Sequence, residues 1–312
     1  MYKAKGATQD MKRNDAAQKN AALNFIFDII RGVAIGIAFI IPGFSGGSVA
    51  AILGIYERLV NAIADIFKCF KKSVMTLLPI GIGMAAGILS LLFPLKWALS
   101  AYPIPTVCIF VGLALGGLPS ITDKLKGRLK LTNIPAFLIP LALAFGLSFM
   151  PVSSDVDLLN LNFGGYVALF LIGIVGSAAL VVPGISGSML LLIFGYYNPI
   201  VSLVTDSLLK GENIGVALSV LCTCGAGIVV GFFAISIIMK LLFKHCTRGT
   251  YFAILGFIIG SIPSVFASTA KEARLSFSEL MPNAIYWIVS ALLLIIGATL
   301  SLALVIYSKK RS

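Results

Sequence analysis

The chain has 312 residues, of which 59% are hydrophobic and only 12% are charged. Soluble domains carry about 25% charged residues, so this composition excludes a water-soluble globular protein. The net charge of +12 does not indicate nucleic acid binding here, because membrane proteins collect lysine and arginine in their cytoplasmic loops.

The amino-terminal segment, residues 1–24, is polar and rich in charged side chains. It holds no apolar core followed by a small-residue cleavage site, so we expect no signal peptide there. We expect this segment to lie in the cytoplasm.

Two apolar segments, 27–41 and 48–63, open the first half. Each is shorter than the roughly 20 residues that a membrane-spanning helix needs. The stretch Pro-Gly-Phe-Ser-Gly-Gly that begins at Pro42 separates them. The pair forms either one broken helix that crosses the membrane or a re-entrant hairpin that enters and leaves on one side. Three longer apolar spans follow, at 73–95, 104–121 and 134–151.

The second half repeats this plan after a connecting loop, residues 152–163, which we expect outside the cell. Two more short apolar segments, 166–182 and 188–204, flank the break that begins at Pro183. A basic tail, residues 308–312, ends the chain and is expected in the cytoplasm. The three longer spans of this half are 214–239, 250–267 and 284–307.

The two halves align with each other in sequence. A shift of 141 residues places the first break on the second, and a shift of 144 aligns glycines of the spans that follow. Chance similarity of apolar runs would not keep glycine and proline in register, so we infer an internal duplication of residues 25–151 as 164–307. The residues aligned around the breaks are Pro42 with Pro183, Gly43 with Gly184, Ser45 with Ser186, Gly46 with Gly187, Gly54 with Gly195 and Tyr56 with Tyr197.

Lysine and arginine decide between the two arrangements of the short segments. With re-entrant hairpins, 18 of these residues lie in loops on the side of the N-terminus and 4 on the other side. A single crossing would instead place the basic clusters at 68–72 and 124–130 outside. Since cytoplasmic loops are enriched in these residues, we expect hairpins, with both termini in the cytoplasm. The predicted fold is an all-α integral membrane protein of two inverted-topology repeats, each one re-entrant helical hairpin plus three transmembrane helices.

The breaks are suited to binding an anion. Proline disfavours helix at the residue before it, and glycine permits a tight turn and close backbone approach. A serine can cap the helix that follows, whose free N–H groups suit a phosphate or carboxylate. Paired breaks of this kind mark binding sites near the midplane of inverted-repeat transporters, although turns that only let short helices pack would give the same pattern. The expected site residues are Pro42, Gly43, Ser45, Gly46, Gly47 and Ser48 in the first break, and Pro183, Gly184, Ser186, Gly187 and Ser188 in the second.

Four charged residues lie within the first hairpin. Asp28 and Arg31 are three residues apart and can pair on one helix face, and Glu57 stands next to Arg58. Either arginine could meet a phosphate with its bidentate fork, so we expect Arg31 and Arg58 to bind substrate. Glu57 and Asp28 are candidates for ion or proton coupling. Alternatively, all four side chains reach the cytoplasmic interface.

Glycines four residues apart mark one face of several predicted spans. Such small-residue faces let helices pack closely, so we expect these rows to be packing surfaces. They are Gly83 with Gly87, Gly112 with Gly116, Gly227 with Gly231 and Gly256 with Gly260.

Cysteine and histidine do not indicate a metal site. The chain has five cysteines, an odd number, and several lie within or beside apolar runs, which does not indicate a disulfide framework. The pair Cys222 and Cys224 lacks a partner cluster. The one histidine, His245, is expected at the membrane interface. We therefore expect no metal and no cofactor.

The first break, continued through Gly54-Ile55-Tyr56-Glu57-Arg58, resembles the bacterial polyprenyl-phosphate transporter family of the PopT type. The second break, continued through Gly195-Tyr196-Tyr197, resembles the second motif of that family, and the resemblance covers residues 25 to 306. It implies a carrier in the plasma membrane, not an enzyme, that returns undecaprenyl phosphate from the outer to the inner leaflet for reuse in cell-wall synthesis. The implied partners are this lipid phosphate and the membrane lipids, with no nucleic acid.

Three other functions remain open at this stage, of which a non-transporting membrane scaffold would leave the duplicated breaks hard to explain. Undecaprenyl-pyrophosphate phosphatases also use inverted repeats and a Pro-Gly-x-Ser motif, but there an arginine follows the serine and a glutamate-rich motif supplies acid–base groups. Here Gly46 and Gly187 follow the serines, and a hydrolase would lack an evident base. The second alternative is a transporter for a small soluble anion, which would not require a lipid tail.

Overall fold

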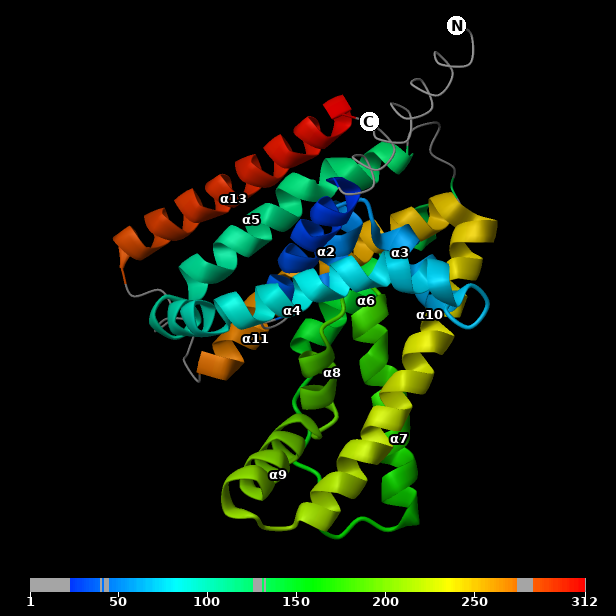
Figure 1. Ribbon diagram of the computed structural model, residues 1–312. Coiled ribbons are helices and arrows are strands. Elements are labelled where there is room, and N and C mark those ends of the chain that lie inside the picture. The colour runs from blue at the N-terminus through cyan, green and yellow to red at the C-terminus, as the bar shows by residue number, and fades with distance from the viewer. Residues whose placement is uncertain are drawn as a thin grey trace, which may run out of the picture.

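The computed structural model describes residues 23–39, 41, 45–125, 131, 133–273 and 283–311. Within these ranges every regular element is a helix (Figure 1), which confirms the predicted all-helical class. Five helical segments there are long and apolar enough to cross a membrane, judged by length and composition. They are α4 (Phe70–Ala101), α5 (Pro103–Thr122), α7 (Phe163–Val181), α10 (Ile214–Gly260) continued by α11 (Ile262–Ala273), and α13 (Ala284–Arg311).

The first half begins with a helix over residues 23–39. Two short helices follow the first break, α2 (Gly46–Ile52) and α3 (Tyr56–Ala64), and their axes differ by 120°. The predicted apolar segment 48–63 therefore consists of two helices and the turn between them. Gly54 takes a φ of 70° between the two helices, a left-handed conformation that ends a helix and favours glycine. After α4 and α5, a short turn η1 (Asp123–Leu125) precedes α6 (Asn133–Phe149).

The second half shows the same division. After α7 come α8 (Gly187–Ile193) and α9 (Tyr197–Lys210), so the predicted apolar segment 188–204 likewise consists of two helices. Gly195 takes a φ of 75° between α8 and α9. A Cβ at this glycine would lie 2.2 Å from the carbonyl oxygen of Ser154, so a larger residue would not fit. Gly54 and Gly195 thus share one conformation, and Tyr56 and Tyr197 each begin the helix that follows.

The long helix α10 includes both a predicted span and the loop predicted after it. The sequence predicts separate spans over 214–239 and 250–267, and α10 consists of two helices that meet at a kink at Cys246 (φ −136°, ψ 45°), inside the predicted loop. The segment 240–248 contains neither glycine nor proline, so helix extends up to the kink from both sides and little loop remains between the two helices. The second predicted span consists of the arm after the kink and the beginning of α11.

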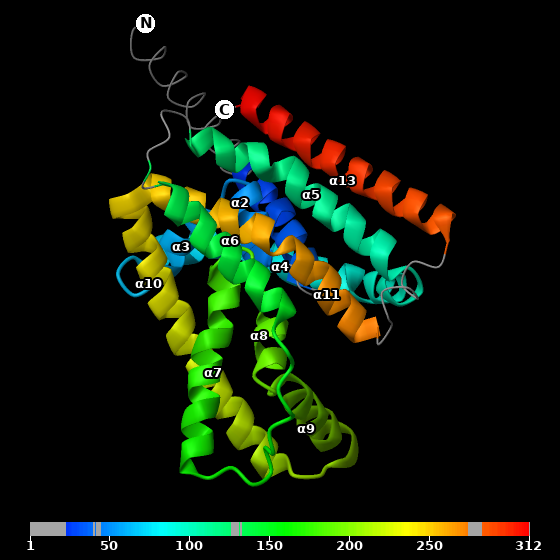
Figure 2. The same cartoon turned by 180° about the vertical axis from the view of Figure 1, so that it is seen from behind.

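Helices pair across the two halves of the chain. The most extensive interface joins α5 to α13, and α10 packs extensively on both α7 and α6. Figures 1 and 2 show α13 lying along α5 over most of its length. The second long helix of the first half thus packs on the last helix of the second half. Likewise α6, the last helix of the first half, packs on α10.

The glycine rows are packing surfaces, as the sequence predicts. A Cβ built on Gly116 would lie 2.0 Å from the carbonyl oxygen of Ala298 in α13, and one on Gly260 would lie 2.4 Å from that of Leu141 in α6. Real side chains do not approach a backbone this closely, so only glycine allows these contacts. The same crowding is found at Gly83, Gly87, Gly112, Gly227, Gly231 and Gly256.

The outer helices expose apolar side chains. On α4, Leu89 and Phe93 are 73% and 78% exposed, and on α13 Ile285 is 71% exposed. An exposed apolar surface of this extent would be unfavourable in water, whereas the same surface fits the hydrocarbon of a bilayer. The helices α4 and α13 therefore present lipid-facing surfaces.

Candidate functional site

Ser45 is the first described residue of the first break, because Pro42, Gly43 and Phe44 lie outside the described residues. It precedes α2 with extended backbone (φ −105°, ψ 127°) but makes no side-chain cap, contrary to one of the roles that the sequence predicts for it. Its hydroxyl instead donates to the carbonyl oxygen of Ala179 in α7, at 3.4 Å. Ser45 and Ser48 are buried, as are Gly46 and Gly47.

The second break has the same backbone geometry at its serine. Ser186 is extended (φ −98°, ψ 126°), and its hydroxyl accepts a hydrogen bond from the Met189 backbone N–H at 3.5 Å, which caps α8 as predicted. Gly184 takes a φ of 84°, and a Cβ there would lie 2.4 Å from the carbonyl oxygen of Phe257. Gly187 and Ser188 begin α8, and the Ser188 side chain lies outside the described part of the structure.

The structure brings the two breaks into contact. A Cβ on Gly47 would lie 3.3 Å from the carbonyl oxygen of Val181 and 3.4 Å from the Cα of Pro183. The hydroxyl of Tyr56, at the start of α3, donates to the same Val181 carbonyl at 2.5 Å. With the Ser45 contact, three residues of the first half therefore meet the end of α7 and the second break.

A buried carboxylate lies between Arg31 of the helix 23–39 and Arg58 of α3. Asp28 is only 6% exposed. The same Asp28 oxygen, Oδ1, accepts from Arg31 at 3.0 Å, the predicted pair, and from Arg58 at 2.5 Å, which the sequence does not predict. Because one carboxylate holds both guanidinium groups, Arg31 and Arg58 are fixed near each other although 27 positions separate them.

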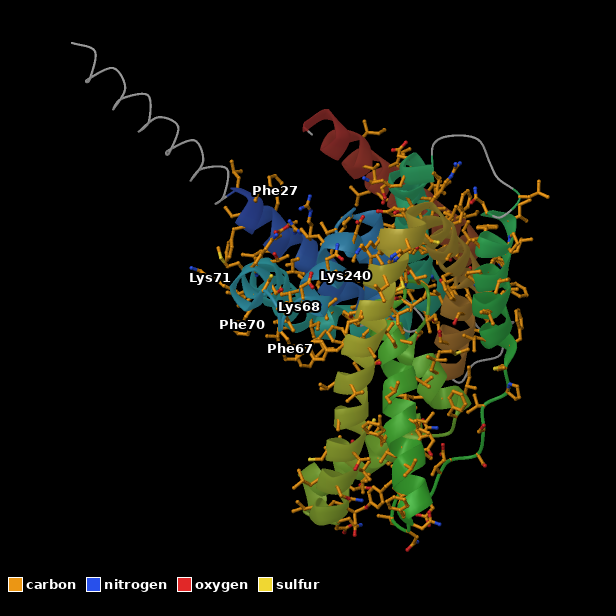
Figure 3. The ribbon with its side chains drawn as sticks, turned by 90° about the vertical axis from the view of Figure 1, so that its right-hand side faces the viewer. Phe27, Phe67, Lys68, Phe70, Lys71 and Lys240 are labelled. Atoms are coloured by element: carbon orange, nitrogen blue, oxygen red, sulfur yellow. The ribbon has the colours of Figure 1, made fainter. Side chains whose placement is uncertain are left out.

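Two polar contacts connect α3 to α10. Lys240 donates to both carboxylate oxygens of Asp65 at 2.5 Å, and the Tyr251 hydroxyl donates to Glu57 at 3.2 Å. Figure 3 shows Lys240 on the α10 ribbon beside the connection between α3 and α4. A polar cavity of about 470 Å³ lies beside these contacts. Its wall includes Glu57, Arg58, Asn61, Asp65 and Lys72.

A second, larger cavity has a volume of about 890 Å³ and is lined mainly by apolar side chains. It lies in the angle of the kinked α10, because residues on both sides of Cys246 line it. Pro183 and Ile185 of the second break also belong to its wall. This cavity therefore joins one of the two predicted breaks to an apolar space of the size that binds small molecules.

Part of this cavity wall is polar, and the sequence does not predict it as a site. His245, Thr247 and Arg248 at the kink line the cavity, together with Asn133 at the start of α6. The Arg248 guanidinium donates to the carbonyl oxygen of Leu125 at 3.1 Å. The sequence does contain a basic cluster around residue 245. If the span is assumed to end at residue 239, however, this cluster is interpreted as a loop at the membrane interface.

Aromatic and basic side chains gather at the turn between α3 and α4. Phe67 and Phe70 are 83% and 68% exposed, and Lys68 and Lys71 beside them are also exposed. Figure 3 shows the four side chains together on one edge of the molecule. Such a mixture suits the boundary between hydrocarbon and headgroups, where aromatic rings and basic side chains gather.

Comparison with known proteins identifies relatives over most of the chain. Residues 35–279 match the undecaprenyl phosphate translocase-like family. A polyprenyl-phosphate transporter of Staphylococcus aureus is 32% identical, over 89% of this chain and 95% of that protein. A polyprenyl-phosphate transporter of Vibrio cholerae is 24% identical, over 92% of this chain and 98% of that protein. No solved structure matches the chain.

Proposed function

This chain belongs to the undecaprenyl phosphate translocase-like family, and we propose that it carries undecaprenyl phosphate from the outer to the inner leaflet of the bacterial plasma membrane. The names of both relatives support a polyprenyl phosphate as the substrate. The observation that carries the proposal is the contact between the two breaks beside a large, mainly apolar cavity. A lipid phosphate needs both, because its head is anionic and its tail is apolar.

The phosphate head passes through the contact region of the breaks. Ser45 and Ser186 carry hydroxyl groups there, and Gly46, Gly47 and Gly187 have no side chain that would separate a phosphate from their backbone N–H groups. Arg31 and Arg58, held together by Asp28, supply positive charge in the same half. The polyprenyl tail lies along the apolar wall of the large cavity and in the surrounding lipid.

The transport cycle rests on an inverted topology. Residues 25–151 and 164–307 are two repeats inserted in opposite orientations, with residues 1–24 and 308–312 in the cytoplasm and the loop 152–163 outside. The helix 23–39 with α2, and α7 with α8, form the two re-entrant hairpins. The matching conformations at Ser45 and Ser186, and at Gly54 and Gly195, support this arrangement.

The contacts between α3 and α10 support a cycle of alternating access. The Asp65–Lys240 ion pair and the Glu57–Tyr251 hydrogen bond hold an element of the first half against one of the second. Breaking them frees the two halves to move relative to each other. Glu57 and Asp28 are the carboxylates that can couple this movement to a proton or another ion.

Reconstitution in liposomes tests the function directly. Purified protein is inserted into liposomes that contain a fluorescent polyprenyl phosphate, and the exchange of the label between leaflets is followed by quenching from outside. We expect exchange well above that of empty liposomes, and slower exchange after Ser45→Ala, Ser186→Ala, Arg31→Gln or Arg58→Gln. Exchange equal to that of empty liposomes would refute the proposal. Equal inhibition by a free phosphate ester without a tail would favour a soluble-anion transporter, and release of inorganic phosphate from the pyrophosphate would favour a phosphatase.

A further inference from the structure

Asn133 is a buried polar residue that none of the roles above explains. It is the first residue of α6 and only 7% of its surface is exposed. Its amide nitrogen Nδ2 is fully buried and has no hydrogen-bond partner among the residues that the structure describes. A buried donor without an acceptor costs about 1–3 kcal/mol, which makes Asn133 a candidate donor to a ligand.

The surroundings of Asn133 specify the charge of that ligand. Asn133 lines the large cavity, and so do Arg248 and His245 at the kink of α10, whereas the described part of the cavity wall contains no aspartate or glutamate. The start of α6 adds the partial positive charge of a helix N-terminus. An anion with several oxygen acceptors fits this combination, and a cation does not.

The Arg248 guanidinium is held in position by its own contacts. It donates to the carbonyl oxygen of Leu125 at 3.1 Å, and its central carbon lies 6.0 Å from the centre of the Phe252 ring. A guanidinium that is positioned before the ligand arrives loses less conformational entropy on binding. The kink at Cys246 turns this part of α10 towards the start of α6.

The rest of the cavity specifies what is attached to the anion. From this polar end the wall continues through apolar residues such as Ile238, Leu242 and Phe257 to Pro183 and Ile185 of the second break. We propose that Asn133, Arg248, Thr247 and His245 form a phosphate-binding subsite for a lipid phosphate whose isoprenoid tail lies against the apolar wall. The inference rests on the proposed function, and it adds a second position for the head, separate from the breaks and bordering the same cavity.

Binding measurements on the full-length protein test the subsite without requiring transport. Purified protein in detergent is titrated with radiolabelled farnesyl phosphate, with farnesol and inorganic phosphate as separate probes. Asn133→Asp keeps the size of the side chain but places a negative charge beside the phosphate. We expect it and Arg248→Gln each to weaken farnesyl phosphate binding about tenfold or more, as the loss of a charge-assisted contact does, with farnesol binding unchanged.

Two matched variants serve as controls. Asn283→Asp changes another asparagine at the start of a helix, where its side chain caps α13, and Lys244→Gln removes an exposed charge from α10 outside the cavity wall. Both should bind farnesyl phosphate like the unmodified protein, and thermal unfolding of each variant shows that it is folded. Unchanged binding in both Asn133→Asp and Arg248→Gln overturns the subsite.

The probes distinguish a lipid phosphate from free phosphate. Together with leaflet exchange, they also distinguish failure of the subsite from failure of the proposed function. Displacement of farnesyl phosphate by inorganic phosphate at equal concentration would assign the subsite to free phosphate and overturn the lipid assignment. Normal farnesyl phosphate binding in the subsite variants, with leaflet exchange intact, removes the subsite and leaves the proposed function standing. If binding depends on Asn133 and Arg248 but the protein shows no leaflet exchange, the subsite stands and the proposed function is refuted.

Discussion

The hydroxyl of Tyr56 donates a hydrogen bond to the backbone carbonyl of Val181, the last residue of α7. Tyr56 is 4% exposed and its ring also packs edge-on against Phe243 of α10. One side chain therefore joins the start of α3 to two helices of the second half. The Val181 carbonyl lies directly before the second break. Because α7 ends there, no backbone N–H of the same helix donates to this carbonyl.

Replacing Tyr56 with phenylalanine keeps the ring and removes the donor. We expect Tyr56→Phe to lower the free energy of unfolding by about 1–3 kcal/mol, since the Val181 carbonyl is left buried without its partner. Thermal unfolding in detergent measures the change. Tyr102→Phe, at an exposed tyrosine between α4 and α5, should leave stability nearly unchanged. Equal unfolding temperatures for the two variants would show that the Tyr56 hydrogen bond does not stabilise the fold.

Two glycines of α4 offer a matched pair for testing close helix packing. A Cβ on Gly83 would lie 2.0 Å from the carbonyl oxygen of Ile29, whereas one on Gly81 meets nothing within 4 Å. We expect Gly83→Ala to be clearly destabilising. Gly81→Ala should stabilise slightly, by about 0.5–1 kcal/mol, through the higher helix propensity of alanine. Denaturation of both variants checks this, and a neutral Gly83→Ala would mean that α4 does not pack closely on the helix 23–39.

The ion pair between Asp65 and Lys240 can be tested by exchanging its charges. Asp65→Lys places two cations together, and Lys240→Asp places two carboxylates together, so each single variant should change leaflet exchange and lower the unfolding temperature. The double variant restores opposite charges, and we expect it to recover most of both properties. A double variant that behaves like the sum of the single ones would show that the pair does not couple α3 to α10.

Cys69 allows the proposed topology to be tested with a natural residue. It is exposed, as are Cys222 and Cys246, while Cys108 and Cys224 are buried. In a variant with Cys222 and Cys246 changed to alanine, a membrane-impermeant maleimide should label Cys69 in inverted vesicles and not in intact cells. Asn160→Cys, introduced with Cys69→Ala in the same background, should label in intact cells. Labelling of both positions from the same side would contradict the re-entrant hairpins.

The sequence predicted the features that depend on local chemistry and on helix faces. The glycine rows and the pair of Asp28 with Arg31 follow from spacing, because residues three or four apart share a helix face. The helix ends near Pro42 and Pro183 follow from the effect of proline on the residue before it. The helical class follows from the long apolar runs. None of these features requires knowledge of which helices meet in space.

The features that the sequence did not predict depend on tertiary structure or on backbone conformation. Glycine at 54 and 195 is compatible with a continuous helix, and only the left-handed φ in the structure shows that the chain turns there. The third member of the Asp28 cluster, Arg58, comes from another helix. The polar wall around Asn133 and Arg248 forms because α10 kinks at Cys246 and brings residues from distant segments to one cavity.

The exchange of helices between the halves has a consequence for how such a chain can be built. The glycine face of α5 is covered by α13, and that of the second arm of α10 by α6, so neither half can close its own packing surfaces. A polypeptide that contained only one half would leave its glycine face uncovered. It could cover that face only by pairing with the last helix of a second copy. When both halves belong to one chain, each glycine face always has its covering helix, whatever the abundance of the protein in its membrane.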